Sequence, residues 1–160
     1  MLHGSGGECK RTESADRDRS AFRSAVDRLT LAITLLEDAH VPFMDLPPNL
    51  HMYYEIDDWT DAWTRPQHVL LIHGFTENVT AWRGWVPHLA RDYRVIRFDQ
   101  RGFGQTGAVP ADFRFTTDLL VDDVVRVINA LAGEPVHVVA GKSGGICACR
   151  LAATRPDLVR

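Results

Sequence analysis

The chain has 160 residues, a net charge of −3 and 45% hydrophobic residues, which is the composition of one soluble globular domain. No run reaches the roughly 18 apolar residues that cross a bilayer, and the first 20 residues have no apolar segment typical of a signal peptide. The mixed, mildly acidic charge excludes the basic surface of a nucleic-acid-binding protein. The three cysteines, Cys9, Cys147 and Cys149, form no disulfide framework, and we expect reduced thiols in a cytoplasmic protein.

The first 43 residues differ in character from the rest. Residues 1–19 are rich in Gly, Ser, Arg, Asp and Glu, which predicts a disordered tail. Residues 20–39 predict an amphipathic helix, because their apolar residues recur at helical spacing: Phe22, Val26, Leu29, Ile33 and Leu36. This stripe either lies on the domain or mediates self-association. An alternative is that Met44 is the natural start and that residues 1–43 extend the gene model.

From Met44 to Arg160, strands alternate with helices. Apolar or alternating runs of strand length predict four strands, over residues 50–57, 69–72, 94–98 and 136–141. Three helical segments are predicted, over residues 80–91 with a break at Pro87, over 117–132, and over 146–154. This alternation implies an α/β fold with a mostly parallel sheet and helices on both of its faces.

Three glycine-containing loops follow the carboxyl ends of predicted strands, over residues 73–75, 99–106 and 141–145. Ligands of open α/β sheets bind at the carboxyl ends of the strands. We therefore expect the three loops to meet in one site, and one of them carries Ser143.

Ser143 lies in the sequence Gly141-Lys142-Ser143-Gly144-Gly145, between a strand and a helix, which is the setting of a nucleophile elbow. A nucleophile in such a turn has strained backbone, and Cβ atoms two residues to either side would collide, which accounts for Gly141 and Gly145. The helix N-terminus favours a bound oxyanion. The expected donors to that oxyanion are the N–H groups of Gly144 and Phe75.

Three segments, taken together and in this order, resemble the N-terminal half of an α/β-hydrolase: His73-Gly74-Phe75, residues 99–106 and residues 141–145. The likeness covers residues 44–160 and is to the branch that holds 3-oxoadipate enol-lactonases, cofactor-free haloperoxidases and small esterases. It implies Ser143 as nucleophile, Phe75 and Gly144 as oxyanion donors, a small ester, lactone or related acyl substrate, and no cofactor or metal. Further residues are expected to shape the elbow and its loops: His73, Gly74, Gly141, Gly145, Asp99, Arg101, Gly102 and Gly104. Haloalkane dehalogenases and epoxide hydrolases are also similar, but they use Asp as nucleophile.

The sequence departs from this family at two points. Lys142 precedes the serine, where the family often has His or an aromatic residue; it is either a solvated lysine on the rim or a cation that activates Ser143 or attracts an anionic substrate. All seven histidines precede Ser143, whereas the family order is Ser, then Asp or Glu, then His. We interpret His73 as a structural residue of the oxyanion loop and His137 as a packed strand residue. The triad Asp and His are therefore expected to be missing from this chain, which would leave it nearly inactive.

Two other functions stay open at this level. In the first, the chain is a non-catalytic binding protein that uses the open sheet edge beside residues 136–141. In the second, its elbow serves C–C bond hydrolysis or cofactor-free halogenation in the same fold. A phosphate-binding loop is excluded, because Val136 stands where that motif requires Gly. Cys147 and Cys149 lack the further ligands that a zinc site needs.

Overall fold

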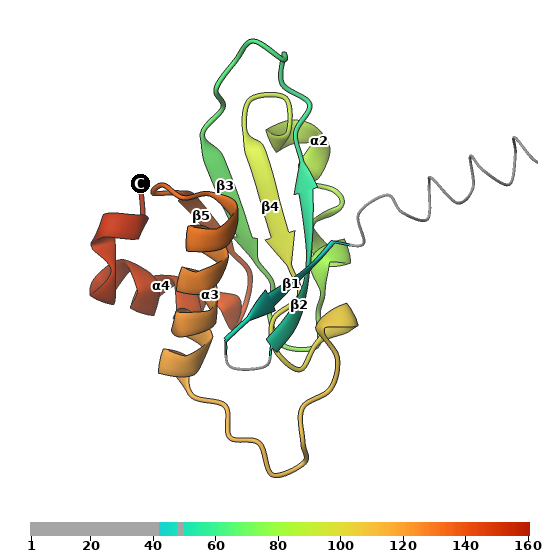
Figure 1. The fold of residues 1–160 in the computed structure, drawn as a ribbon, viewed down its shortest axis with the longest axis vertical. Helices are drawn as coiled ribbons and strands as arrows, with labels where there is room; N and C mark the ends of the chain where they lie inside the picture. Colours follow the sequence, from blue (N-terminus) through green and yellow to red (C-terminus); the bar gives the residue numbers. More distant parts are fainter. Residues whose placement is uncertain (1–41, 48–49) are drawn as a thin grey trace, which may run out of the picture. The chain divides into compact units, whose positions relative to one another are not determined.

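A computed structural model describes residues 42–47 and 50–160 of the chain (Figure 1). The tail predicted over residues 1–19 and the amphipathic helix predicted over 20–39 lie outside the described residues. Five strands form one sheet: β1 (Phe43–Leu46), β2 (Leu50–Asp57), β3 (His68–Ile72), β4 (Arg94–Phe98) and β5 (His137–Ala140). Their order in the sheet is β1-β2-β4-β3-β5.

The sheet is mixed rather than mostly parallel. β3 pairs in parallel with β4 and with β5, whereas β2 pairs antiparallel with both β1 and β4. A parallel pair needs a crossover connection of a dozen or more residues. Only residues 47–49 separate β1 from β2, so this pair is antiparallel. The parallel part is the half of the sheet that ends in the three glycine-containing loops.

β1 was not predicted from the sequence, and the boundary predicted at Met44 falls inside it. The strand is short and its pattern of apolar residues is weak. Its register pairs Phe43 with Tyr53, and the two rings make an edge contact with centroids 5.2 Å apart. This cross-strand contact, which joins residues ten positions apart, holds β1 at the end of the sheet.

The helical segments lie close to where the sequence predicts them. The segment predicted over residues 80–91 is broken into η1 (Val79–Trp82) and α2 (Val86–Leu89), with Pro87 in the first turn of α2. α3 covers Thr117–Leu131, and the Thr116 hydroxyl caps it by accepting the Leu119 N–H at 3.1 Å. α4 covers Gly144–Thr154, and the short turns η2 (Gly104–Thr106) and η3 (Pro156–Leu158) complete the set.

Helices cover both faces of the sheet, as expected (Figure 1). Successive residues of β3 point to opposite faces. Leu70 and Ile72 pack into the core that α3 and α4 cover, and Leu71 packs with Trp82 and Val86 on the other face. β3 is thereby buried on both sides, which agrees with its continuous apolar sequence.

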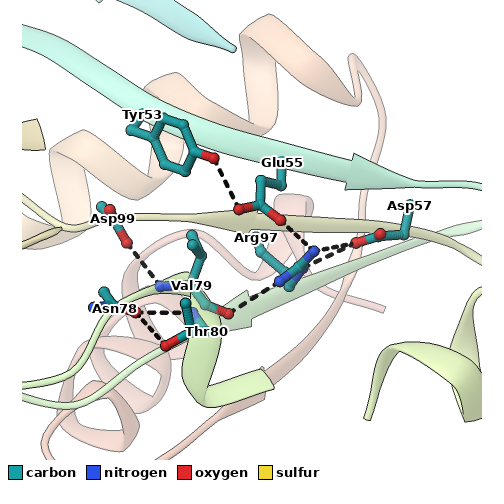
Figure 2. Close-up of polar contacts among 8 residues, drawn as sticks. All are labelled: Tyr53, Glu55, Asp57, Asn78, Val79, Thr80, Arg97 and Asp99. Carbon is teal, nitrogen blue, oxygen red and sulfur yellow. Dashed lines mark hydrogen bonds and ion pairs between the residues drawn. The ribbon is translucent and has the colours of Figure 1, made fainter. Parts of the chain in front are cut away.

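A buried arginine anchors the segment that follows β3 to the neighbouring strands (Figure 2). Arg97 of β4 is 5% exposed and forms ion pairs with Glu55 and Asp57 of β2. It also donates to the Val79 carbonyl at 3.1 Å, at the start of η1. The Asp99 carboxylate accepts the Val79 N–H at 2.7 Å. The loop between β3 and η1 is thus held at its far end by β2 and β4.

β5 is the last strand of the described sheet. Beside it, Val136 forms an isolated parallel bridge with Val159. Self-association through this edge stays a prediction. Within the described ranges, no helix is both long and apolar enough to cross a membrane.

Candidate active site

The loops that follow β3, β4 and β5 meet at one edge of the sheet, as the sequence predicts. The Gln100 N–H, just after β4, donates to Nε2 of His73 at 2.9 Å, just after β3. The Phe75 N–H donates to Oγ of Ser143 at 2.7 Å, which joins the loop after β3 to the loop after β5. Two hydrogen bonds therefore connect all three strand ends.

His73 is a buried, structural residue of this junction. It is fully buried, and its Nε2 must carry a lone pair because it accepts the Gln100 N–H. Its Nδ1 therefore carries the proton and donates it to the Gly74 carbonyl at 2.7 Å. Burial lowers the pKa of His73, which favours this neutral form. Both ring nitrogens are occupied, so His73 is not placed to act as a base for Ser143.

Asp99 and Gly104 shape the loop after β4. The Asp99 carboxylate is 1% exposed, and it accepts the N–H groups of Val79 and Gln105 at 2.7 Å each. Gly104 has a φ of +53°, and a Cβ atom on it would lie 2.0 Å from Oδ2 of Asp99. Only glycine fits this close approach.

The other two predicted loop residues contact α3 and the segment before it. Arg101 forms a bidentate ion pair with Asp123 of α3, with both distances 2.9 Å and both residues buried. Gly102 lies against the Phe115 ring, just before α3. Asp123 could not be singled out from the sequence, because 22 residues separate it from Arg101 and no motif connects them.

The strained residue of the elbow is Lys142 rather than Ser143. Lys142 has a φ of +50°, and with Thr76 it is one of two non-glycine residues with positive φ in the described part of the chain. Ser143 has φ −65° and ψ −23° and already continues into α4. A nucleophile elbow places its apex residue in the strained conformation. By this criterion the apex is one residue earlier than the sequence suggests.

The glycines of the elbow support the same correction. A Cβ atom on Gly144 would lie 2.6 Å from the carbonyl oxygens of Ile72 and His73, at the end of β3. A Cβ atom on Gly145 meets nothing within 4 Å, and one on Gly141 makes only ordinary contacts with Trp82. The sterically required glycine therefore stands two residues after Lys142, whereas Gly145 stands two residues after Ser143 and is not required.

The N–H groups at the elbow have different partners from those predicted. The Gly144 N–H, predicted as an oxyanion donor, donates to the Gly141 carbonyl at 2.9 Å. The Ser143 N–H, next after the strained residue, has no hydrogen-bond acceptor within residues 42–47 and 50–160. The Phe75 N–H points at an oxygen, which is Oγ of Ser143. The Ser143 N–H is thus free to bind a ligand, and the Phe75 N–H becomes free when Oγ of Ser143 moves away.

Lys142 is paired with an acid on the loop after β3. Its ammonium lies 2.5 Å from Oε1 of Glu77, and Oε2 of Glu77 accepts the Gly74 N–H at 2.9 Å. The Lys142 hydrogen bond lowers the pKa of the Glu77 carboxyl, with a further contribution from the Gly74 N–H. Sequence reasoning missed Glu77, because it lies 65 residues from Lys142 and follows the His-Gly-Phe motif without belonging to it.

An open cavity of about 130 Å³ lies on the α3 side of Ser143. Its walls are largely apolar, and they are formed by Phe75, Phe115, Thr116, Thr117, Leu120, Ser143, Ile146 and Cys147. Burial raises the pKa of the Cys147 thiol to about 11, so Cys147 lines this wall as a neutral group. The cavity suits a small, mostly apolar ligand with one polar group near Ser143.

A family model described as "alpha/beta hydrolase fold" matches residues 67–160, more than half of the chain. The chain belongs to the α/β-hydrolase family. The 2-hydroxymuconate semialdehyde hydrolase of Pseudomonas sp. (strain CF600) is 40% identical over 95 residues, which cover 58% of this chain and 33% of that protein. Epoxide hydrolase B of Mycobacterium tuberculosis (strain ATCC 25618 / H37Rv) is 37% identical over 90 residues, which cover 56% of this chain and 25% of that protein.

Solved structures share the fold. The enol-lactonase from Burkholderia xenovorans LB400 superimposes with a TM-score of 0.67 at 23% identity, over 74% of this chain and 44% of that one. The chain spans a quarter to a third of the length of the two curated relatives named above. Both curated relatives named above are hydrolases by name.

An α/β-hydrolase needs a base for its nucleophile. In the described part of the chain, no histidine is hydrogen-bonded to Ser143. His51 and His68 contact the carboxylates of Asp45 and Glu134, and Nε2 of His137 contacts Gln67 at 2.7 Å. Across the same residues, no three His, Cys, Asp or Glu side chains are grouped as a metal site would require.

Proposed function

We propose that the protein is a hydrolase of an ester, lactone or related acyl compound, and that the substrate carbonyl oxygen binds the Phe75 N–H. The observation that carries the proposal is the 2.7 Å hydrogen bond from the Phe75 N–H to Oγ of Ser143. An oxygen atom already fits at hydrogen-bond distance from this backbone donor. Fixed N–H groups of this kind stabilise the negative charge that develops on a carbonyl oxygen during acyl transfer.

In this proposal Ser143 is the nucleophile. Its hydroxyl lines the largely apolar cavity, where the rest of an acyl substrate would lie. Support for Ser143 comes from this position and from its contact with Phe75, and not from backbone strain, which falls on Lys142. The proposal assigns no base to Ser143, because no histidine of residues 42–47 and 50–160 is hydrogen-bonded to it.

The names of the relatives support an electrophilic substrate but leave its chemical class open. Their names refer to a semialdehyde, an epoxide and an enol-lactone. Of these, the lactone is closest to the acyl chemistry that the Phe75 N–H favours. A binding protein without catalysis is the second candidate, and the observation that favours it is the lysine at the apex of the elbow.

A fluorophosphonate probe tests the proposed function, because its phosphoryl oxygen occupies an oxyanion site after attack by a serine. We expect slow labelling of the 160-residue chain, mapped by mass spectrometry to Ser143 and abolished by Ser143→Ala. Thr117→Val is the matched control, since it removes another hydroxyl from the same cavity.

The backbone donor is tested by two substitutions at one position. Phe75→Pro removes the N–H, whereas Phe75→Ala removes the ring and keeps the N–H. We expect Phe75→Pro to slow labelling by about 100-fold or more, the loss typical of one oxyanion donor, and Phe75→Ala to have a much smaller effect. Labelling that avoids Ser143, or that responds equally to both substitutions, would contradict the proposal.

A further inference from the structure

The residue at the apex of the elbow is a lysine held in a strained conformation. A non-glycine residue with φ near +50° costs on the order of 1–2 kcal/mol, so the surrounding structure must hold it there. Close packing against Gly74, in the loop after β3, holds Lys142 in this conformation. A Cβ atom on Gly74 would lie 2.8 Å from Cβ of Lys142, which shows that the lysine fills this space to contact distance. Strain of this kind is typical of functional positions.

The amine of Lys142 faces the loop that carries the Phe75 N–H. Glu77 holds the amine with Oε1 and the Gly74 N–H with Oε2, so one carboxylate joins the lysine to the residue next to Phe75. The Lys142 side chain is nevertheless 70% exposed, and a ligand can reach it. Lys142 and Glu77 line an open cavity together with Trp82, Trp85 and Gly141, so a reactive carbonyl group bound there would meet an amine and a carboxylate.

The choice of lysine is unusual for this chain. Of its 18 lysine and arginine residues, only Lys10 and Lys142 are lysines. An arginine would form an ion pair with Glu77 at least as well, but a guanidinium group does not lose its proton. A lysine amine can lose its proton and attack a carbonyl carbon. Lys142 is the one lysine among residues 42–160, and it occupies the apex of the elbow, where this fold carries its nucleophile.

We propose that Lys142 is the reacting group of this elbow toward aldehydes and ketones, which it captures as an imine. The neutral amine attacks the carbonyl carbon, a C–N bond forms, and a proton passes from nitrogen to the carbonyl oxygen through the Glu77 carboxylate. The C–O bond of the carbinolamine then breaks, and the hydroxyl leaves as water with the remaining proton of the nitrogen, which gives the imine. This activity goes beyond the proposed hydrolysis, because it needs neither Ser143 as nucleophile nor a leaving group.

Reductive trapping tests the proposal on the 160-residue chain. The protein is incubated with benzaldehyde and sodium cyanoborohydride at neutral pH, and peptide mapping follows the benzyl adduct at each lysine. Lys10 serves as the internal reference amine. We expect Lys142 to react at least about tenfold faster than Lys10 in the folded protein, because the bound carbonyl is held beside it. The two rates should become equal in concentrated urea, and this comparison depends on no variant.

Variants separate this chemistry from serine hydrolysis. Lys142→Arg should remove the adduct at this position and leave the Lys10 rate unchanged. Ser143→Ala should abolish fluorophosphonate labelling, and the Lys142 adduct should still form in this variant, because the imine needs no serine nucleophile. The proposal is overturned if Lys142 reacts no faster than Lys10 in the folded protein, or if Ser143→Ala removes the difference between them.

Discussion

Replacing Gly144 by alanine tests which residue is the apex of the elbow. The added Cβ would lie 2.6 Å from two backbone carbonyl oxygens at the end of β3. β3 is hydrogen-bonded to β4 on one side and to β5 on the other, so these oxygens cannot retreat. The first turn of α4 must move instead. Overpacking against rigid neighbours costs typically 1–3 kcal/mol, and with two backbone contacts we expect about 3 kcal/mol.

The neighbouring glycine is the matched control. A Cβ on Gly145 meets nothing within 4 Å, and this residue lies inside α4. Alanine at an open helical position stabilises by about 0.5–1 kcal/mol relative to glycine. Two adjacent Gly→Ala variants of the same helix should therefore differ by about 3 kcal/mol or more in their free energy of unfolding. Gly141→Ala, whose Cβ lies 3.6 Å from the Trp82 ring, should be tolerated.

Urea denaturation followed by tryptophan fluorescence measures these differences. With a slope of about 1–3 kcal/mol per molar urea, the midpoints of the Gly144→Ala and Gly145→Ala proteins should lie at least about 1 M apart. An elbow centred on Ser143 predicts the reverse pattern, with Gly141 and Gly145 sensitive and Gly144 tolerant. Equal stability of the two variants, or a greater loss at Gly145, would refute the assignment of the apex to Lys142.

Three further substitutions or modifications test the loops around the site. Asp123→Asn should cost about 3–5 kcal/mol of stability in urea denaturation, because it leaves the buried Arg101 guanidinium without its charge partner. Gly104→Ala should cost about 3 kcal/mol or more by the same measurement, because its Cβ would overlap the Asp99 carboxylate and its φ is positive. Iodoacetamide at pH 8 should leave Cys147 unmodified in the folded protein and modify it in urea, as peptide mapping will show, because burial raises the pKa of this thiol to about 11.

The fold could be predicted because its signals are local. The central strands β3 and β4 are short apolar runs, and α3 has both a helical apolar stripe and a capping threonine. β1 escaped prediction because four residues are too few to show a period, and its stability comes from pairing with β2. The antiparallel placement of β2 likewise depends on pairing that no local pattern reveals.

The site could be predicted only in part. The meeting of its three loops follows from the rule that strand ends converge. The hydrogen bond from the Phe75 N–H to Oγ of Ser143 was not predicted. The ion pairs that hold the site were not visible, because they join residues far apart in the chain. Lys142 and Glu77 are 65 residues apart, and Arg101 and Asp123 are 22 apart. Charged residues of either sign are common on any surface, so a sequence offers no reason to pair these in particular.

The register of the elbow was missed for a more specific reason. All residues from Ala140 to Gly145 except Lys142 are small. The segment therefore contains two overlapping patterns, one centred on Ser143 and one centred on Lys142, and both have small residues two positions to either side of the centre. From the sequence alone, the pattern centred on Ser143 was preferred, because serine is a familiar nucleophile. The two patterns differ in which glycine cannot carry a Cβ atom. In the structure this residue is Gly144, because the first turn of α4 packs closely against the end of β3. Serine is the more familiar nucleophile, but the backbone strain and the close packing at Gly144 place Lys142 at the apex. Because the apex is defined by this packing, any activity of the elbow has to be accounted for with an amine at its apex and a hydroxyl one residue beyond it.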